Sequence, residues 1–325
     1  MRRRRVVSII LSIAGFVLLA WLIRKTGIEK VRDGLLTVGW GFGVILALSF
    51  TRFVLRSYAW MLLLEHPAPL RAAVAATISG DALGNVTPLG LAASEPAKSV
   101  YLTAHAPATH SFAALTAENF FYSVSVAIYI CIGGVALLSA FTLSPAVRIY
   151  GCISLAAMGL VLGTAAWIAL RKPAAASALI ARVPSRRVAG LLERVQQLEA
   201  RAYGAVARHD APIGRVVLVE AVFHLVSLAE CWYTLWLLTG ASQLLAALAF
   251  DSVNRVINVA FRVIPFRWGV DQAAASAVAD SVGVRPDVAI VLALVRTSRL
   301  IVWAAVGFVI WARNGARKDG SRLGA

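Results

Sequence analysis

Two pairs of arginines stand within long apolar stretches of the sequence. Arg52 and Arg56 are four residues apart, and Arg296 and Arg299 are three apart, so each pair shares one face of a helix. An arginine at the centre of a bilayer costs at least about 2.5 kcal/mol, so it is normally paired or lines a polar cavity. Because the planar guanidinium matches phosphate oxygens, these spacings favour a basic cavity that binds a phosphate.

The competing interpretation is that the same arginines form structural ion pairs that hold a helix bundle together. Buried ion pairs can also exist for specificity alone, so the pattern leaves both interpretations open. Five acidic residues lie where they could be counterions: Glu95, Glu118, Glu230, Asp251 and Asp271.

The stretch GNVTPLGLAASEPAK, residues 84–98, interrupts an otherwise apolar region. Pro88 removes a backbone donor and restricts the residue before it, so a helix is broken here. Irregular backbone at membrane depth is tolerated only where protein or a water-filled cavity covers it. The residues that suggest a buried polar site are Asn85, Gly90, Glu95 and Lys98. The alternative is an ordinary loop outside the membrane between two short spanning helices.

A second break is predicted at 264–269, within NVAFRVIPFRWGVDQA. The two stretches are weakly similar, because each contains an asparagine, a proline, a glycine and an acid in the same order. The first set is Asn85, Pro88, Gly90 and Glu95, and the second is Asn258, Pro265, Gly269 and Asp271. Glu118 follows the first proline, and Arg296 and Arg299 follow the second, by about thirty residues. Inverted repeats with broken helices are typical of secondary transporters, whose site lies at the breaks.

The whole chain has the composition of a membrane protein. Of its 325 residues, 59% are hydrophobic and only 15% are charged, whereas a soluble domain is nearer half apolar and a quarter charged. Its net charge of +16 does not indicate nucleic acid, because the cations gather at the termini and in 171–215. That distribution follows the positive-inside rule and favours anionic lipid headgroups as partners. The three cysteines show no metal-ligand spacing and imply no disulfide framework.

These patterns predict an all-α polytopic membrane protein with about six full transmembrane helices and two re-entrant broken-helix pairs related as inverted repeats. The full helices are expected at 6–23, 38–64, 111–140, 146–170, 213–240 and 287–312, and the broken pairs at 70–103 and 243–283. Each half of a broken pair is short for a full crossing. A single membrane domain, 1–312, would contain repeats at about 38–140 and 213–312. An amphipathic segment at 171–212 and a basic tail at 313–325 are expected on the cytoplasmic side.

Both termini are expected in the cytoplasm, and the membrane is expected to be a bacterial inner (plasma) membrane. The basic MRRRR start, the segment 171–215 and the basic end fall on one side when the predicted helices are counted. Three crossings separate the two broken pairs, so the pairs would enter from opposite sides. The loop RKTGIEKVRD, residues 24–33, fits poorly because its four cations would lie outside.

At these residues the chain resembles the lysylphosphatidylglycerol synthase transmembrane family, also called flippase-like. The resemblance spans about 6–312 and rests on Asn85–x–x–Pro88–x–Gly90, Glu95–Pro96–x–Lys98, VIPFRWGVDQA, Arg56–x–x–x–Trp60 and Arg296. It implies a membrane domain with two re-entrant pairs that moves or holds a lipid. The departures from the family pattern are Ala92 or Ala93 for a glycine, Phe266 and Arg267 for a glycine pair, Asp271 for Glu and Lys98 for Arg. These departures leave the identity of the headgroup open.

The sequence therefore predicts a lipid transporter or flippase-like protein that binds an anionic (phospho)lipid headgroup in a polar intramembrane cavity. The residues expected to bind it are Arg52, Arg56, Asn85, Pro88, Gly90, Glu95, Lys98, Glu118, Asn258, Arg262, Pro265, Arg267, Asp271, Arg296 and Arg299. No catalytic motif, cofactor site or metal pattern is recognised, so no enzymatic activity is expected.

Two other classes of function stay open. One is a non-transporting membrane subunit of a lipid biosynthesis complex, for example for hopanoids or aminoacylated lipids. The other is an integral-membrane lipid-modifying enzyme that uses Glu95 or Asp271 as acid or base. Anionic lipids are the expected partners, and the sequence leaves a homo-oligomer or a biosynthetic partner open.

Overall fold

The computed structural model describes residues 24, 28–65, 68–86, 91–171, 177–178, 181, 186–207, 211–261, 264–267 and 269–323. The regular elements within these ranges are helices, and no strand occurs in them. The all-helical class predicted from the sequence is therefore confirmed.

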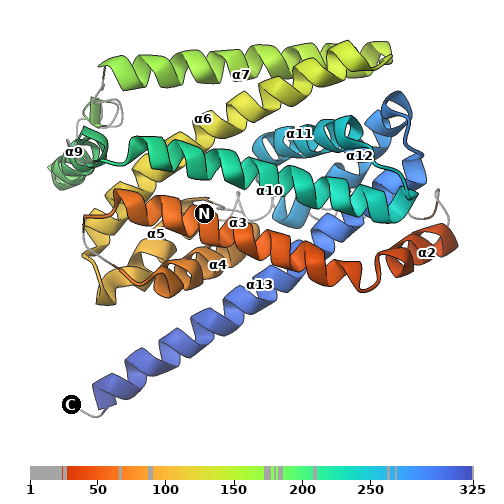
Figure 1. The fold of residues 1–325 in the computed structure, drawn as a ribbon. Helices are drawn as coiled ribbons and strands as arrows, with labels where there is room; N and C mark the ends of the chain where they lie inside the picture. Colours follow the sequence, from red (N-terminus) through yellow and green to blue (C-terminus); the bar gives the residue numbers. More distant parts are fainter. Residues whose placement is uncertain are drawn as a thin grey trace.

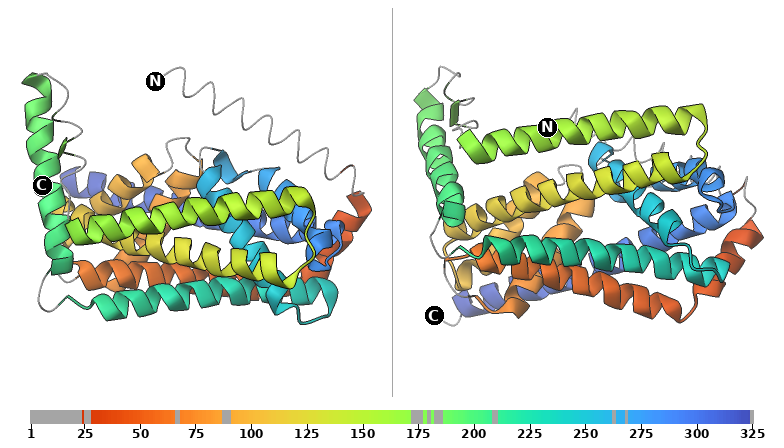
Figure 2. Two further views of the ribbon diagram at one scale, coloured as in Figure 1. Left: turned by 90° about the horizontal axis from the view of Figure 1, so that it is seen from above. Right: turned by 45° about the horizontal axis from the view of Figure 1, so that its top comes forward.

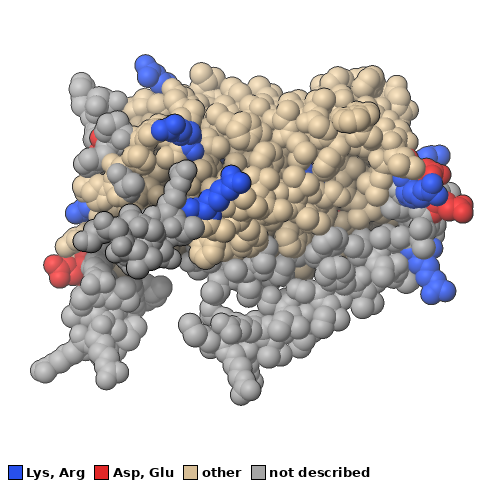
Figure 3. Space-filling model, turned by 90° about the horizontal axis from the view of Figure 1, so that it is seen from below, with Lys and Arg blue, Asp and Glu red and all other residues tan. Residues whose placement is uncertain are grey.

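Five of the described helices are long and apolar enough to cross a membrane. They are α3 (Gly41–Leu63), α6 (Ala108–Ala140), α7 (Pro145–Arg171), α10 (Ile213–Thr239) and α13 (Pro286–Leu323). Each begins within a few residues of a predicted span, because a bilayer requires about 20 consecutive apolar residues. The sixth predicted span, 6–23, lies outside the described residues. In Figure 3, charged side chains gather toward the two ends of the molecule and leave an uncharged band between them.

Two pairs of shorter helices interrupt this pattern where breaks were predicted. In the first pair, α4 (Leu70–Val86) and α5 (Leu91–Tyr101) flank residues 87–90, which lie outside the described residues, and a 3-10 turn (Leu102–Ala104) follows. In the second pair, α11 (Leu244–Ala260) and α12 (Val270–Ala279) flank the second break, and a 3-10 turn (Asp280–Val282) follows. The helices of each pair pack against one another.

The second break contains a tight left-handed bend. A short 3-10 turn, η2 (Pro265–Arg267), lies within it, and both Phe266 and Arg267 have a φ of 51°. Gly269 follows with a φ of 75°. Non-glycine residues rarely adopt this region of φ, so the chain holds an unfavourable backbone here to reverse direction between α11 and α12.

The two pairs lie at opposite ends of the long helices (Figures 1 and 2). The α4–α5 pair lies on the side of α9 (Arg186–Ala207) and of the C-terminal end of α13. The α11–α12 pair lies on the side of α2 (Ile28–Val38). The two pairs therefore approach the long helices from different ends of the bundle.

Packing between the helices is reciprocal. The most extensive packing is between α3 and α10. The helix α4 packs on α13, and α11 packs on α6. The second helix of each pair also packs on the long helix that follows it, α5 on α6 and α12 on α13. The approach of α13 to α4 depends on Gly307, since a Cβ there would lie 2.6 Å from the Ile78 carbonyl oxygen.

Three features differ from the sequence-based expectations or extend them. Residues 28–38, expected in part as a loop, form α2, because IEKVRDGLLTV repeats apolar residues at helical spacing and Val38 packs against α13. The helix α13 continues to Leu323 instead of ending at 312. The amphipathic segment does contain a helix, α9, which packs on α6.

We predict that the two short pairs are accessible from opposite faces of the membrane. In a background without the native cysteines, Thr103→Cys and Arg285→Cys place exposed thiols after the two pairs. A membrane-impermeant maleimide should label them from opposite sides of oriented vesicles. Both positions should react equally once the vesicles are permeabilised. Labelling of both from the same side would contradict the placement of the pairs.

Candidate intramembrane site

A cavity of about 470 Å³ lies between the two short pairs and the long helices. Seven basic side chains from the described residues line it: Arg52, Arg56, Lys98, Arg255, Arg267, Arg296 and Arg299. Five carboxylates line it too: Asp81, Glu95, Glu230, Asp251 and Asp271. Uncharged polar side chains complete the lining, among them Asn85, Ser94, Asn119, Ser227, Asn254 and Asn258. Such a lining would be unstable against lipid tails and is compatible only with water or a polar ligand.

An ion pair with two hydrogen bonds joins α3 to α6. Arg56 donates from Nε and Nη2 to the two carboxylate oxygens of Glu118, both at 3.0 Å. The same Nη2 also donates to Asn119 at 3.0 Å, and Asn119 donates to Glu95 at 2.9 Å. The Glu118 side chain is only 1% exposed, so it lies behind Arg56 and acts on the cavity through it. This bidentate geometry fixes the direction of the Arg56 guanidinium.

Lys98 is buried on the first short pair. Its ammonium lies 2.8 Å from Asp81 and 3.2 Å from Glu95, and its side chain is 2% exposed. The side chain lies over Gly80 of α4, where an added Cβ would stand 3.0 Å from the Lys98 Cε atom. The glycine therefore lets α4 and α5 approach closely enough to bury a charged amine between two carboxylates.

One carboxylate serves two arginines on the other side of the cavity. Glu230 of α10 accepts from Arg52 at 3.2 Å and from Arg299 of α13. The arginines that the sequence placed on separate helices are thus joined through a shared acid. This arrangement draws α3, α10 and α13 together.

The second short pair carries its own polar cluster. Arg255 pairs with Asp251 of the same helix at 3.3 Å, and Asp251 also accepts from Ser227 at 3.2 Å. Asn254 donates to Asp271 at 2.6 Å and links α11 to the start of α12. This hydrogen bond joins the two sides of the second break.

Arg296 differs from the other arginines. Its guanidinium donates to the thiol sulfur of Cys231 at 3.1 Å, and the thiol donates to the carbonyl oxygen of Ala247. Among the described residues, no carboxylate oxygen lies within 4.0 Å of it. The Arg296 residue is 7% exposed. A buried guanidinium with a weak neutral acceptor retains most of its capacity to bind an anion.

Ten of the fifteen predicted site residues line this single cavity: Arg52, Arg56, Asn85, Glu95, Lys98, Asn258, Arg267, Asp271, Arg296 and Arg299. Glu118 lies behind Arg56 as its counterion. Pro88, Gly90 and Arg262 lie outside the described residues, and only the backbone of Pro265 is described, in η2. Whether these residues bind a ligand stays a prediction.

Sequence reasoning missed several polar lining residues, among them Asp81, Asn119, Asn254 and Arg255. Two signals could have indicated them. Arg255 follows Asp251 by four residues on one helix face, and Asn119 is adjacent to Glu118. Asp81 and Asn254 could be recognised only once the breaks had brought their helices together.

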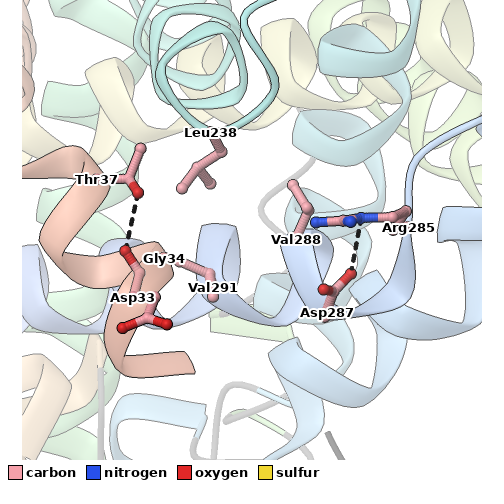
Figure 4. A pocket seen from close by; sticks show the side chains of 8 residues that line it. All are labelled: Asp33, Gly34, Thr37, Leu238, Arg285, Asp287, Val288 and Val291. Carbon is pink, nitrogen blue, oxygen red and sulfur yellow. Dashed lines mark hydrogen bonds and ion pairs between the residues drawn. The ribbon is translucent and has the colours of Figure 1, made fainter. Parts of the chain in front are cut away.

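A second hollow of about 270 Å³ lies near α2, at the end of the bundle (Figure 4). Its basic residue, Arg285, is 78% exposed at the side chain and pairs with Asp287 at 3.4 Å. Thr37 hydrogen-bonds to the backbone of its own helix at Asp33. Solvated groups that already have local partners give little binding free energy, so the central cavity is the stronger candidate.

A bundle of membrane-length helices around a cavity lined with ion pairs is the architecture of a helical membrane protein with a polar cavity among its helices. A family model described as the lysylphosphatidylglycerol synthase TM region matches residues 5–310. The chain belongs to that family, and the resemblance seen in its motifs is confirmed. The family consists of membrane proteins whose function involves lipids. No curated protein and no solved structure matches the chain.

We predict that Glu118 is needed mainly for stability. Glu118→Ala would leave Arg56 buried without its carboxylate, and breaking a buried pair in this way costs about 3–5 kcal/mol. Thermal unfolding of the purified protein in detergent should show a large fall in Tm. Glu193→Ala, on the exposed face of α9, is the control and should leave Tm unchanged.

The double variant Arg56→Met/Glu118→Leu separates a lost pair from an unpaired charge. Because both charges are removed together, it should recover much of the stability that Glu118→Ala loses. A Glu118→Ala protein that melts like the wild type would show that the pair does not stabilise the bundle.

Proposed function

We propose that the protein binds the headgroup of an anionic phospholipid in the central cavity and moves that lipid across the membrane. The observation that carries the proposal is Arg296, which faces the cavity without a carboxylate within 4.0 Å among the described residues. Five of the other lining cations each contact a carboxylate of the protein, namely Arg52, Arg56, Lys98, Arg255 and Arg299. A phosphate oxygen is therefore the natural counterion for Arg296, because a guanidinium binds it with two parallel hydrogen bonds.

Movement of the lipid requires a cavity that can open toward either face. We infer that α4–α5 and α11–α12 are re-entrant pairs of two inverted repeats, about 38–140 and 213–312. The reciprocal packing of α4 on α13 and of α11 on α6 supports this inference. So does the placement of the short pairs at opposite ends of the bundle (Figure 1). In transporters with this symmetry, one repeat rocks against the other around a fixed central site.

The positions of charged residues support the same relation. Asp81 is the twelfth residue of α4, and Arg255 is the twelfth residue of α11. Glu118 is the eleventh residue of α6, and Arg296 is the eleventh residue of α13. Equivalent positions thus carry opposite charges. Three of these residues line the cavity, Asp81, Arg255 and Arg296, and Glu118 lies behind it as the counterion of Arg56.

The location is part of the proposal. The membrane is proposed to be the inner (plasma) membrane, with both termini, α9 and the end of α13 on the cytoplasmic side. The positive-inside distribution of the sequence supports this orientation, and α9 and the end of α13 lie at the same end of the bundle (Figure 2).

A membrane subunit of a lipid biosynthesis complex is the second candidate, favoured by the synthase in the description of the family. It would use the same cavity to hold a lipid for a partner enzyme. Reconstitution separates the two candidates. Vesicles that contain the purified protein alone should equilibrate fluorescent phosphatidylglycerol between leaflets if it is a transporter, whereas a subunit that only holds lipid would not accelerate this exchange.

We predict that Arg296→Gln weakens binding of dioleoylphosphatidylglycerol about tenfold or more, the effect of losing a hydrogen bond to a charged group. Its Tm should change little, because the partner that remains is a thiol and not a buried carboxylate. Lipid binding is measured with the purified protein by native mass spectrometry, and stability by thermal unfolding.

Arg255→Gln is the matched control for that experiment. It removes the ion pair of the buried Asp251 carboxylate, so Tm should fall. If Arg296→Gln loses Tm but keeps its lipid affinity, Arg296 is a structural residue and the headgroup site is wrong.

We also predict that the protein has no catalytic activity of its own, since the sequence contains no recognised catalytic motif. Purified protein incubated with phosphatidylglycerol should return the lipid unchanged in mass. The appearance of a new covalent lipid species in the absence of a partner, and its loss in Glu95→Gln or Asp271→Asn, would instead assign an enzyme.

A further inference from the structure

A second polar group is buried between α6 and α10, outside the lining of the central cavity. It consists of Glu220 and His224 on α10 and Ser125 on α6. Glu220 is 2% exposed and His224 is 6% exposed. The two residues are one helical turn apart and meet at the same hydroxyl. Ionisable residues buried inside a membrane bundle are costly and commonly belong to ion or proton pathways.

The hydrogen bonds of Ser125 require a choice between protonation states. Its hydroxyl oxygen lies 2.9 Å from His224 Nε2, 3.3 Å from a Glu220 carboxylate oxygen and 2.9 Å from the Tyr122 carbonyl oxygen. A hydroxyl has one hydrogen to donate. If it donates to the Glu220 carboxylate, the His224 Nε2 atom must bring its own hydrogen. If it donates to the histidine or the carbonyl, Glu220 must be protonated to form a hydrogen bond with it.

The group also contains unused hydrogen-bonding capacity. Among the described residues, neither Glu220 Oε1 nor His224 Nδ1 has a hydrogen-bond partner. Burying a carboxylate oxygen without a donor costs free energy, and protonation of the carboxyl group removes most of that cost. The three side chains can therefore accept or release a proton with only a rotation of the Ser125 hydroxyl.

Aromatic rings connect this group to the arginines of the cavity. The Arg56 guanidinium stands 3.8 Å from the centre of the Tyr122 ring, and Tyr122 supplies the carbonyl that accepts from Ser125. The Arg52 guanidinium stands 4.8 Å from the Phe223 ring, which packs edge to face on His224.

The third ring belongs to Tyr129. It stacks on His224 with centroids 4.9 Å apart, and the Arg255 guanidinium lies 4.4 Å from its centre. Three arginines that line the central cavity thus each touch the ring of a residue that contacts the buried group, Phe223 and Tyr129 through their rings and Tyr122 through its backbone carbonyl. A change in the position or the charge of these arginines therefore alters the packing and the electrostatic potential at Glu220 and His224.

We propose that Glu220, Ser125 and His224 form a proton-binding site that is linked to the headgroup cavity, so that the protein exchanges a proton as the cavity fills or empties. The proposal rests on the proposed function for its link to lipid, but the site itself does not. Exchange of a proton at this site would couple the movement of the lipid to the proton gradient across the membrane.

The direction of the link follows from the charges that face the group. On α3 these are Arg52 and Arg56, on α6 Glu118, and on α11 Asp251 and Arg255. The arginines favour the ionised form of Glu220, and the neighbouring acids oppose it. An anionic headgroup bound to the arginines offsets their charge, so binding should draw a proton onto Glu220. Release of the lipid should return that proton.

The first experiment detects the proton without any lipid. Infrared difference spectra of the purified protein during a pH titration should contain a carbonyl band of a buried carboxylic acid. Glu220→Gln should abolish the band, and Ser125→Ala should shift its frequency, because that variant keeps the carboxyl group and removes its hydrogen bond. Glu193→Gln, exposed on α9, should change nothing. Spectra without a band that responds in this way would overturn the proton site.

The second experiment tests the link to the cavity. Calorimetric titration with dioleoylphosphatidylglycerol in buffers of different ionisation enthalpy measures proton uptake on binding. The wild type should take up protons, and Glu220→Gln should bind the lipid without uptake. Binding by the wild type without any proton exchange would overturn the link. If the wild type binds no phosphatidylglycerol, the link falls together with the proposed function, and the infrared titration alone decides the proton site.

Discussion

The cost of burying charge among membrane helices governs this structure. An ionised group that leaves water must find an opposite charge or a set of hydrogen bonds. Glu118 meets Arg56 through two hydrogen bonds, Lys98 lies between two carboxylates, and Glu230 accepts from Arg52 and Arg299. These pairs join helices that are far apart in the sequence, so satisfying the charges also determines which helices are neighbours.

The short helix pairs allow polar groups to reach positions that continuous helices leave apolar. A continuous spanning helix presents only side chains to the centre of a membrane, whereas a pair that ends near the centre also brings backbone groups and chain ends there. Gly80 allows the Lys98 side chain to fit between α4 and α5, and the left-handed bend at Phe266 and Arg267 reverses the chain before α12. Polar residues near the two interruptions, among them Asn85, Ser94, Asn258 and Arg267, line the cavity inside the apolar bundle.

The proposed function depends on a buried arginine that has no carboxylate in direct contact among the described residues. Most cations of the cavity have acidic partners within the chain, but Arg296 has a thiol. A site of this kind can hold an anion without breaking the pairs that stabilise the fold, which separates binding from stability. The aromatic rings of Tyr122, Phe223 and Tyr129 lie between these arginines and the buried Glu220 group. Charge in the cavity and protonation behind it are therefore physically connected.

The sequence by itself determined the helical class, the positions of the five long helices that the structure describes and the second break, because these depend on local hydropathy and on where proline and glycine fall. It also indicated most of the charged residues of the cavity, since an arginine in an apolar run needs a polar environment. It did not indicate α2, because the charged residues of that segment made it resemble a loop. It also did not indicate the roles of Asp81, Asn119 and Asn254. Only the tertiary structure decided which acid meets which arginine, because those contacts depend on how helices separated by up to 178 positions pack together.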